Sequence, residues 1–337
     1  MWTEEILDNL LIEPTEALVG DMSGLNGDVL ILGAGGKMGP TLAVMCKRAL
    51  EKAGSRGKVF AVSRFTDPLA LAFLRKHHVE AVSADLMEEG VLERLPDAEN
   101  IVFMAGLKFG TFGNEVRTWA MNARLPVLVS ERYKGKRIVV FSSGNVYPQT
   151  PLADGGSSEA VPPAPVGDYG ASVLARERMF EYAAAFGSKI ALFRLFYAVD
   201  LRYGVLCDIA SGIMSGNAVS LGVPAFNCIW QADASEYALR LLPRLTDGVT
   251  TINVTGPETA STRSTAIELG KLLGREPVFS GEAGPTAIIG NAGLCFETFG
   301  YPSVPLRTMI KWQAEWILAG GRTLNKPTHF EEKEGRY

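Results

Sequence analysis

Short apolar segments alternate with helix-like segments from residue 28 to residue 195. The expected strands are 28–33, 58–63, 79–83, 100–104, 137–142 and 190–195, and the expected helices include 36–53, 68–77 and 169–186. Strands that are apolar along their whole length and separated by helices are typical of a parallel sheet covered on both faces. The pattern therefore predicts an α/β fold with a doubly wound parallel sheet.

Glycine and proline interrupt the pattern beyond residue 195, where helices are expected near 233–245, 264–273 and 306–318. We expect a smaller C-terminal α/β substrate lobe. The predicted divisions are an N-terminal arm (1–27), the sheet domain (28–195), a partly interleaved second lobe (196–325) and an exposed polar tail (326–337). In the arm, Ile6, Leu7, Leu10 and Leu11 share one helical face, which predicts a helix docked on its own chain or on a partner subunit.

Composition excludes several classes of protein. The formal net charge of −4 disfavours a nucleic-acid binder, which normally has a basic surplus. The four cysteines are far apart and form no CxxC pair, which favours reduced thiols in a cytoplasmic protein. No His, Cys and carboxylate cluster has metal-ligand spacing, and no apolar run approaches the roughly 20 residues that span a bilayer. We therefore expect neither a protein-built metal site nor a membrane partner.

A glycine-rich segment follows the first predicted strand. Glycines there permit a tight turn and let the backbone approach a pyrophosphate, and the next helix presents unbonded N–H groups and a positive dipole. In the first βαβ unit of an alternating chain this segment indicates a Rossmann-type nucleotide site. The candidate residues are Gly33, Gly35, Gly36, Lys37, Met38 and Gly39.

The end of the second strand bears on the choice of nucleotide. NAD-binding Rossmann units place a carboxylate there for the ribose 2′-hydroxyl, whereas this chain has Ser63 and Arg64. An arginine can bind a 2′-phosphate through charge-assisted hydrogen bonds, and Lys37 would add a second positive charge nearby. The sequence favours NADP over NAD and leaves both open.

Further segments agree in order and spacing with a known family. They are Gly33-x-x-Gly36-x-x-Gly39, Asp85-Leu86, the strand end at Ala105-Gly106, the serine segment 141–147, Tyr169, and residues 194–197, 230–233 and 253–256. Over residues 28–320 this set resembles the extended short-chain dehydrogenase/reductase superfamily, of the NAD(P)-dependent epimerase/dehydratase type. The resemblance implies that Asp85 and Leu86 contact the adenine, that Ala105 and Gly106 lie under the nicotinamide ribose, and that the protein is a homodimer.

The resemblance also implies a catalytic serine, a tyrosine and a lysine four residues after the tyrosine. Ser143 and Tyr169 fill the first two positions, but the third is Val173. Valine can neither donate a hydrogen bond nor lower a neighbouring pKa by charge. Three alternatives remain open: Lys108 or Arg176 supplies the charge, Tyr169 works without a lysine, or the protein binds nucleotide and has lost redox chemistry.

The substrate is the least constrained part of the analysis. Nucleotide-sugar enzymes of this type hold a diphosphate with arginines, and residues 226–230 and 290–294 contain none. Gly144-Asn145 also lacks the acidic pair of the 4,6-dehydratases. We therefore predict an epimerase or oxidoreductase for a small sugar, sugar acid or lactone, with a catalytically impaired regulatory or sensor protein as the alternative. Candidate substrate contacts are Tyr197, Asn227 and Trp230, with Arg202 for an anionic group.

Overall fold

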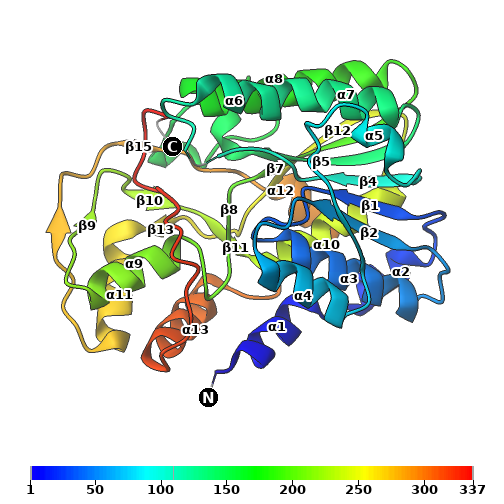
Figure 1. Ribbon diagram of the computed structural model, residues 1–337. Helices are drawn as coiled ribbons and strands as arrows, with labels where there is room; N and C mark the ends of the chain where they lie inside the picture. Colours follow the sequence, from blue (N-terminus) through cyan, green and yellow to red (C-terminus); the bar gives the residue numbers. More distant parts are fainter. Residues whose placement is uncertain (1, 109, 336–337) are drawn as a thin grey trace.

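The computed structural model describes residues 2–108 and 110–335. Its centre is a seven-stranded sheet in the order β12-β7-β5-β4-β1-β2-β3, in which every neighbouring pair is parallel (Figure 1). The strands are β1 (Val29–Leu32), β2 (Val59–Ser63), β3 (Glu80–Ser83), β4 (Asn100–Phe103), β5 (Arg137–Ser143), β7 (Lys189–Leu195) and β12 (Gly248–Val254). The predicted doubly wound sheet is confirmed, and β12 is an addition that the sequence analysis missed.

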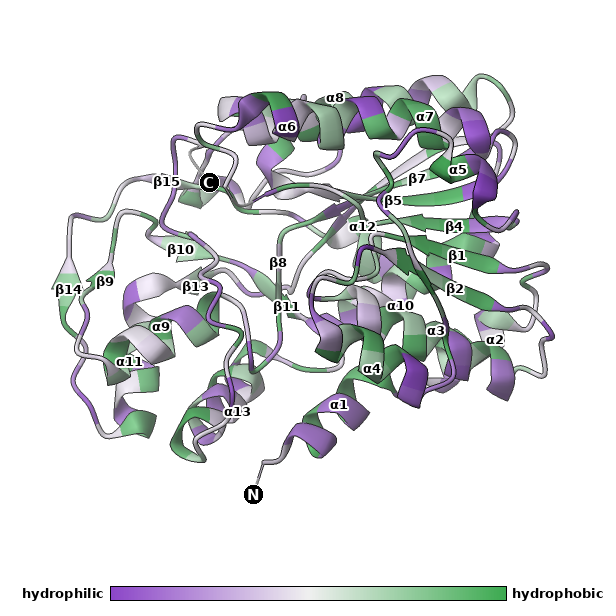
Figure 2. Cartoon of the chain, in the orientation of Figure 1, coloured by the Kyte–Doolittle hydropathy of each residue, from purple (hydrophilic) through white to green (hydrophobic). Residues whose placement is uncertain are grey.

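Both faces of the sheet are buried, and its strands are apolar along most of their length (Figure 2). In β1, Val29 and Ile31 belong to one buried cluster, whereas Leu30 and Leu32 belong to another. The first cluster is covered by α3 (Gly39–Lys52), α4 (Pro68–Lys76) and α10 (Gln231–Leu241); the second by α5 (Val91–Arg94), α7 (Leu125–Arg132) and α8 (Gly167–Ala184). Burial on both faces is the reason that these strands show no apolar–polar alternation.

The order of the strands reverses at β1. The chain moves outward from β1 to β2 and β3, and then returns to place β4 on the other side of β1. Ligands of open α/β sheets bind outside the carboxyl ends of the strands at such a reversal. The glycine-rich segment follows β1 and the Ala105-Gly106 segment follows β4, so the fold brings the two together at this point.

The second lobe is a set of short paired strands and helices beside the carboxyl edge of the sheet (Figure 1). Its elements are β8 (Tyr197–Val199), α9 (Val205–Met214), β9 (Val219–Ser220), β10 (Ala225–Phe226), β11 (Cys228–Trp230), β13 (Ala260–Ser261), α11 (Thr262–Leu273), β14 (Phe279–Ser280), β15 (Thr286–Ala287) and α13 (Leu306–Leu318). Helix α12 (Gly293–Phe299) instead packs on β12 of the sheet. Between them the chain returns to the sheet through α10 and β12, as expected for an interleaved lobe.

The N-terminal arm forms two helices, α1 (Glu4–Ile12) and α2 (Glu16–Met22), which pack on α3 and α10. Of the two predicted possibilities, the structure shows the arm docked on its own chain. The apolar face is rotated from the predicted one, because Leu7, Leu11 and Ile12 are buried whereas Ile6 and Leu10 are exposed. The Trp2 indole extends the contact and donates a hydrogen bond to Glu315 of α13 at 3.0 Å.

The C-terminal segment is packed against both lobes, which corrects the predicted exposed tail. Thr328 donates to the Asp208 carboxylate through its backbone N–H at 2.7 Å and through its hydroxyl at 2.6 Å. The Phe330 ring is buried against Phe226. Further along, the carbonyl of Lys333 accepts a hydrogen bond from Gln149 in the sheet domain at 3.2 Å. Thr328 and Phe330 are the buried residues of the described part of this segment. Because the residues around them are polar, the composition of the segment did not indicate that it packs on the protein.

Candidate active site

The glycine-rich segment turns tightly against the end of β4. Gly33 has φ +92, and a Cβ there would lie 2.5 Å from the backbone nitrogen of Ala105. A Cβ on Gly39 would lie 2.4 Å from the carbonyl oxygen of Ala34. Helix α3 begins at Gly39 without a side-chain cap, so its first N–H groups remain available to an anion. This geometry fits the pyrophosphate of a dinucleotide.

The two cations predicted near a 2′-phosphate have different neighbours. Arg64 Nη1 lies 4.0 Å from Asp85 Oδ2, and both side chains are about half exposed. Lys37 instead extends toward the second lobe, with its Nζ 3.3 Å from the centre of the Tyr203 ring. Ser63 lies against the glycine-rich segment, because a Cβ on Gly35 would come within 2.5 Å of its Oγ. Arg64 therefore remains a candidate to bind a ribose 2′-phosphate. Lys37 instead lies beside Tyr203 of the second lobe.

The predicted serine and tyrosine meet at the carboxyl end of β5. Tyr169 lies in the first turn of α8, and its hydroxyl shares a hydrogen bond with the side chain of Ser143. The backbone N–H of Asn145 donates to Ser143 Oγ at 3.2 Å, which holds the serine in place. Burial raises the pKa of Tyr169, while the Arg176 charge and the bond to Ser143 act in the opposite direction.

Val173 occupies the position of the expected lysine and is fully buried. It packs in a small apolar cluster with Val146, Tyr147 and Tyr169. The position one turn after Tyr169 is therefore apolar. Any positive charge near the tyrosine must come from a residue other than the one at position 173.

Two cations lie near Tyr169, as the sequence analysis proposed. Lys108 Nζ is 6.0 Å from the centre of the Tyr169 ring and 5.7 Å from that of Tyr197. Burial lowers the pKa of Lys108 to about 8. Arg176 is also buried, but it donates to the carbonyl of Phe141 and to Asn122 Oδ1, both at 2.7 Å. Its hydrogen bonds thus hold the scaffold, whereas the Lys108 ammonium faces the aromatic groups of the site.

Asn122 is a buried residue that the sequence analysis missed. It lies in a π-helical turn, Ala120–Arg124, between α6 (Glu115–Trp119) and α7. Its side chain accepts from the N–H of Leu107 and donates to the carbonyl of the same residue, both at 2.9 Å, and it donates to Ser172 at 3.0 Å. Asn122 therefore fixes the backbone directly before Lys108. The available signal was an asparagine among four apolar residues, Trp119, Ala120, Met121 and Ala123.

A buried ion pair supports the site from behind. Glu177 of α8 accepts two hydrogen bonds from Arg194 of β7, at 2.9 and 2.7 Å, and a third from Ser142 of β5. Arg194 also donates to the Tyr147 hydroxyl at 2.7 Å, which in turn donates to Asn253 of β12 at 2.9 Å. The network joins α8, which carries Tyr169, to the strand that carries Ser143.

Most of the predicted substrate contacts have structural partners. Arg202 forms ion pairs with Asp200, Glu4 and Asp8, at 3.2, 3.0 and 2.8 Å, and so ties α1 to the second lobe. Asn227 is buried and donates to the carbonyl of Gly290 at 2.7 Å. Only Tyr197, beside Lys108, is placed at the candidate site.

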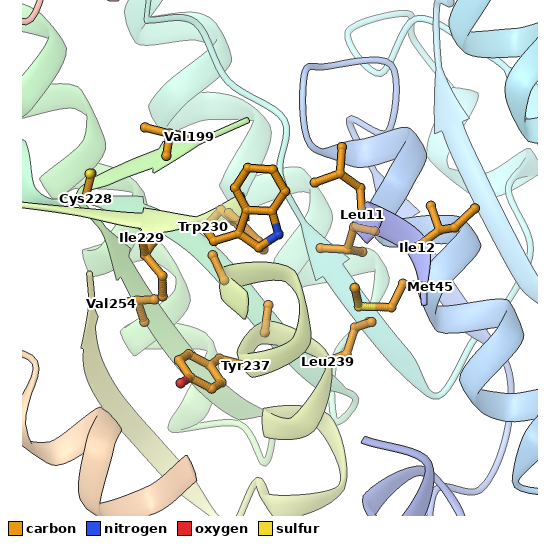
Figure 3. Close-up of a cluster of buried hydrophobic side chains, with 14 of the residues drawn as sticks. Leu11, Ile12, Met45, Val199, Cys228, Ile229, Trp230, Tyr237, Leu239 and Val254 are labelled. Carbon is orange, nitrogen blue, oxygen red and sulfur yellow. The ribbon is translucent and has the colours of Figure 1, made fainter. Parts of the chain in front are cut away.

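Trp230 belongs to the core. It is 2 % exposed and lies among apolar side chains that include Leu11 and Val199 (Figure 3). Its ring packs edge-on against Trp312 with centroids 5.6 Å apart. The prediction of a stacking contact to substrate is wrong for this residue, because its apolar surface is already covered.

Within residues 2–108 and 110–335, no group of three or more His, Cys, Asp or Glu side chains could hold a metal ion. In the same part of the chain, no helix has the length and apolar character needed to cross a membrane.

Comparison with known proteins places the chain in a familiar structural group. The model of the NAD dependent epimerase/dehydratase family matches residues 29–199. A search of curated proteins gave no match. Among solved structures, UDP-glucuronic acid 4-epimerase from Bacillus cereus in complex with NAD has a TM-score of 0.74 at 17% identity, covering 87% of this chain and 99% of that chain.

Two further structures are similar. UDP-glucose 4-epimerase from Thermotoga maritima with UDP-glucose has a TM-score of 0.72 at 18% identity, with coverage of 87% of this chain and 99% of that chain. WbmG from Bordetella bronchiseptica in complex with NAD has a TM-score of 0.71 at 18% identity, with coverage of 90% and 98%. At these identities the structural likeness establishes the fold.

Proposed function

The chain belongs to the NAD dependent epimerase/dehydratase family, and on that premise we propose that it is an epimerase or oxidoreductase for a small sugar, sugar acid or lactone. The observation that carries the proposal is the hydrogen bond between Ser143 and Tyr169, with the Lys108 ammonium 6.0 Å from the tyrosine ring. A protein that only senses nucleotide needs none of these three groups.

The nucleotide would be held at the strand-order reversal. The turn at Gly33 and the uncapped start of α3 would receive its pyrophosphate, Asp85 and Leu86 its adenine, and Ala105-Gly106 its nicotinamide ribose. When bound, a nicotinamide takes a hydride from a substrate carbon and, in an epimerase, returns it. The structures of two similar proteins contain NAD.

The residues of this chain would handle the proton. The Tyr169 hydroxyl would exchange a proton with the substrate oxygen, and Ser143 would hold that oxygen by a hydrogen bond. Burial raises the pKa of Tyr169, so the reaction needs a nearby positive charge to favour the tyrosinate. We assign that task to Lys108, whose Nζ lies 6.0 Å from the centre of the Tyr169 ring, in addition to Arg176, whose charge already lowers the pKa of Tyr169.

The substrate is proposed to lack a nucleoside diphosphate. Two of the similar structures are UDP-sugar epimerases, but residues 226–230 and 290–294 of this chain contain no arginine. In addition, Asn227 is buried and bonded to Gly290, which joins these two segments to each other. A buried diphosphate requires cationic partners that these segments do not offer.

The substrate prediction is tested by binding and turnover with matched compounds. We expect purified protein with added dinucleotide to bind or convert free D-glucose, D-glucuronate or a hexonolactone, and to show no binding of UDP-glucose or UDP-glucuronate at millimolar concentration. Isothermal titration calorimetry and chromatography of the products give the two readouts. Micromolar affinity for either UDP-sugar would contradict the prediction.

NADP is proposed as the preferred dinucleotide because Arg64 stands where a carboxylate would hold NAD. Replacing Arg64 with alanine is expected to raise the Kd for NADP about tenfold, since a hydrogen bond to a charged group contributes about 1.5–3 kcal/mol and Arg64 is half exposed. The Kd for NAD should stay within about twofold. Arg56→Ala, at the opposite end of β2, is the control. Tighter binding of NAD than of NADP by the wild type would defeat the assignment.

A catalytically impaired regulatory or sensor protein is the alternative, and the apolar surroundings of Val173 favour it. Freshly purified protein distinguishes the cases when its nucleotide is released by denaturation and identified by chromatography. Stoichiometric retained dinucleotide supports an epimerase that keeps its cofactor, whereas weak exchangeable binding with turnover supports a dehydrogenase. Nucleotide binding with no turnover of any carbohydrate supports the sensor.

We also propose that the protein forms a homodimer and is located in the cytoplasm. Val116 of α6 and Tyr182 of α8 are 88% and 68% exposed, which suits a helix-to-helix subunit contact. All four cysteines are free and buried, as is usual in a reducing compartment.

A further inference from the structure

Three lysines from distant parts of the chain approach one carboxylate between the two lobes. Lys37 belongs to the glycine-rich segment, Lys108 to the loop after β4, and Lys326 to the C-terminal segment. Lys37 interacts electrostatically with the other two and with Asp208 of α9, and Lys108 interacts with the same carboxylate. We call Lys37, Lys108 and Lys326 around Asp208 the interlobe lysine cluster.

Aromatic rings orient the cluster toward the reaction centre. Lys37 Nζ lies 3.3 Å from the centre of the Tyr203 ring. Lys108 Nζ lies within 6.0 Å of the ring centres of both Tyr169 and Tyr197. Lys108 thus joins the cluster to the tyrosine of the candidate active site.

Positive charge exceeds negative charge in the cluster. Asp208 is already bonded to Thr328 through two donors, and Glu331 lies nearby on the same segment. Burial and the charges of Lys108 and Lys326 lower the pKa of Lys37 to about 7. An anion placed among the three ammonium groups would relieve this repulsion and would replace the lost solvation.

A cavity with both polar and apolar walls adjoins the cluster. It has a volume of about 480 Å³ between α9 and the C-terminal segment, and Tyr203, Asp208 and Lys326 line it. Its wall also carries hydroxyl and amide groups, those of Ser211, Ser215, Asn217, Ser220, Thr323 and Asn325. Arg202 borders it as well, but its guanidinium is paired with three carboxylates. These polar groups offer hydrogen bonds to the hydroxyl groups of a sugar, and the apolar part of the wall, which includes Val219 and Phe330, can contact its carbon skeleton.

We propose that the interlobe lysine cluster binds an anionic group of the substrate, a carboxylate or a phosphate, while the cavity holds its hydroxyl-bearing chain. The inference rests on the proposed carbohydrate reaction and narrows its substrate to a sugar acid or a sugar phosphate. It also transfers the anion-binding role from Arg202 to lysines contributed by both lobes. The pyrophosphate of the dinucleotide is the competing anion, and its expected position is at the backbone N–H groups of α3.

The test uses Lys37→Met and Lys326→Met, because methionine keeps an unbranched side chain and removes the charge. Lys326 is exposed, so its replacement leaves the core intact, and the exposed Lys271→Met in α11 is the matched control. With saturating dinucleotide, calorimetry gives the affinity for D-glucuronate, D-glucose 6-phosphate and neutral D-glucose. We expect Lys37→Met to weaken binding of at least one anionic sugar about tenfold or more, and Lys326→Met to weaken it less. Affinity for D-glucose and for the dinucleotide should stay within about twofold.

The other outcomes overturn the inference. If Lys37→Met weakens binding of the dinucleotide alone, Lys37 contacts the pyrophosphate. If it weakens binding of anionic and neutral sugars equally, the cluster maintains the shape of the site and does not recognise a charge. If the wild type binds UDP-sugars and no free sugar, the proposed substrate size fails. In that case the affinities for UDP-glucuronate and UDP-glucose are compared instead. The inference stands only if the wild type binds UDP-glucuronate more tightly and Lys37→Met abolishes this difference. Absence of binding by every anionic compound also overturns it.

Discussion

Replacing Tyr169 with phenylalanine is expected to lower kcat by about 10²- to 10⁴-fold, the usual contribution of a general acid–base group. The change removes only the hydroxyl that shares a hydrogen bond with Ser143. The ring stays in its apolar contacts with Val146 and Val173, so the fold and the dinucleotide Kd should change little. Steady-state turnover of whichever free sugar proves active is the measurement.

Lys108→Met is expected to reduce kcat about 10- to 100-fold. Its Nζ lies 6.0 Å from the centre of the Tyr169 ring, and two unit charges at about this separation in a protein interact by on the order of 2–3 kcal/mol. Lys108 has its pKa lowered to about 8 and is therefore charged below that pH. Its support for the tyrosinate is present below pH 8 and is lost as the pH rises through it. The wild type should accordingly lose rate above about pH 8, and the variant should lack this decline.

Two comparisons make the result specific to the site. Tyr301→Phe, at a tyrosine that is 72% exposed and lies outside α6 and α8, should leave kcat unchanged. Full turnover by Tyr169→Phe would contradict the proposal that the Tyr169 hydroxyl transfers the proton. Loss of rate in Tyr169→Phe with an unaltered Lys108→Met would instead show that Lys108 does not supply the charge. It would leave Arg176 as the source, or a Tyr169 that works without a lysine.

The central sheet was predictable because its strands are short and apolar, and because burial on both faces leaves a continuous apolar run. Strand β12 was not, since Thr250 and Thr251 interrupt its apolar character. It is an edge strand, bonded to β7 alone, so its amino-terminal half faces solvent and tolerates polar residues. Its pairing is decided by the arrangement of the whole chain, which a local pattern does not contain.

In the candidate site, too, some features could be predicted from the sequence and others could not. The pairing of Ser143 with Tyr169 followed from a resemblance that fixes their spacing along the chain. The direction of Lys37 did not, because a side chain in the glycine-rich segment can extend to either lobe, and contact with Tyr203 depends on how the lobes pack. Asn122 escaped prediction for a related reason, since a π-helical turn changes the face on which a residue lies.

Glu177→Gln is expected to lower the free energy of unfolding by about 3–5 kcal/mol, the usual cost of removing one partner of a buried ion pair. The Glu177 and Arg194 side chains are 0% and 4% exposed, so the variant leaves a buried guanidinium without a counter-charge. Urea denaturation followed by circular dichroism gives the difference. Because Glu177 also holds Ser142, next to Ser143, we expect kcat to fall under conditions where the variant is fully folded.

The same helix offers a matched control for this effect. Glu181 pairs with Arg178 at 2.6 Å, but these side chains are 30% and 51% exposed, so Glu181→Gln should cost less than about 1 kcal/mol. An equal loss in the two variants would mean that α8 is sensitive to any lost charge, and would remove the special role of the buried pair. If instead only Glu177→Gln loses stability and rate together, the ion pair behind the site supports both the fold and the position of the catalytic serine.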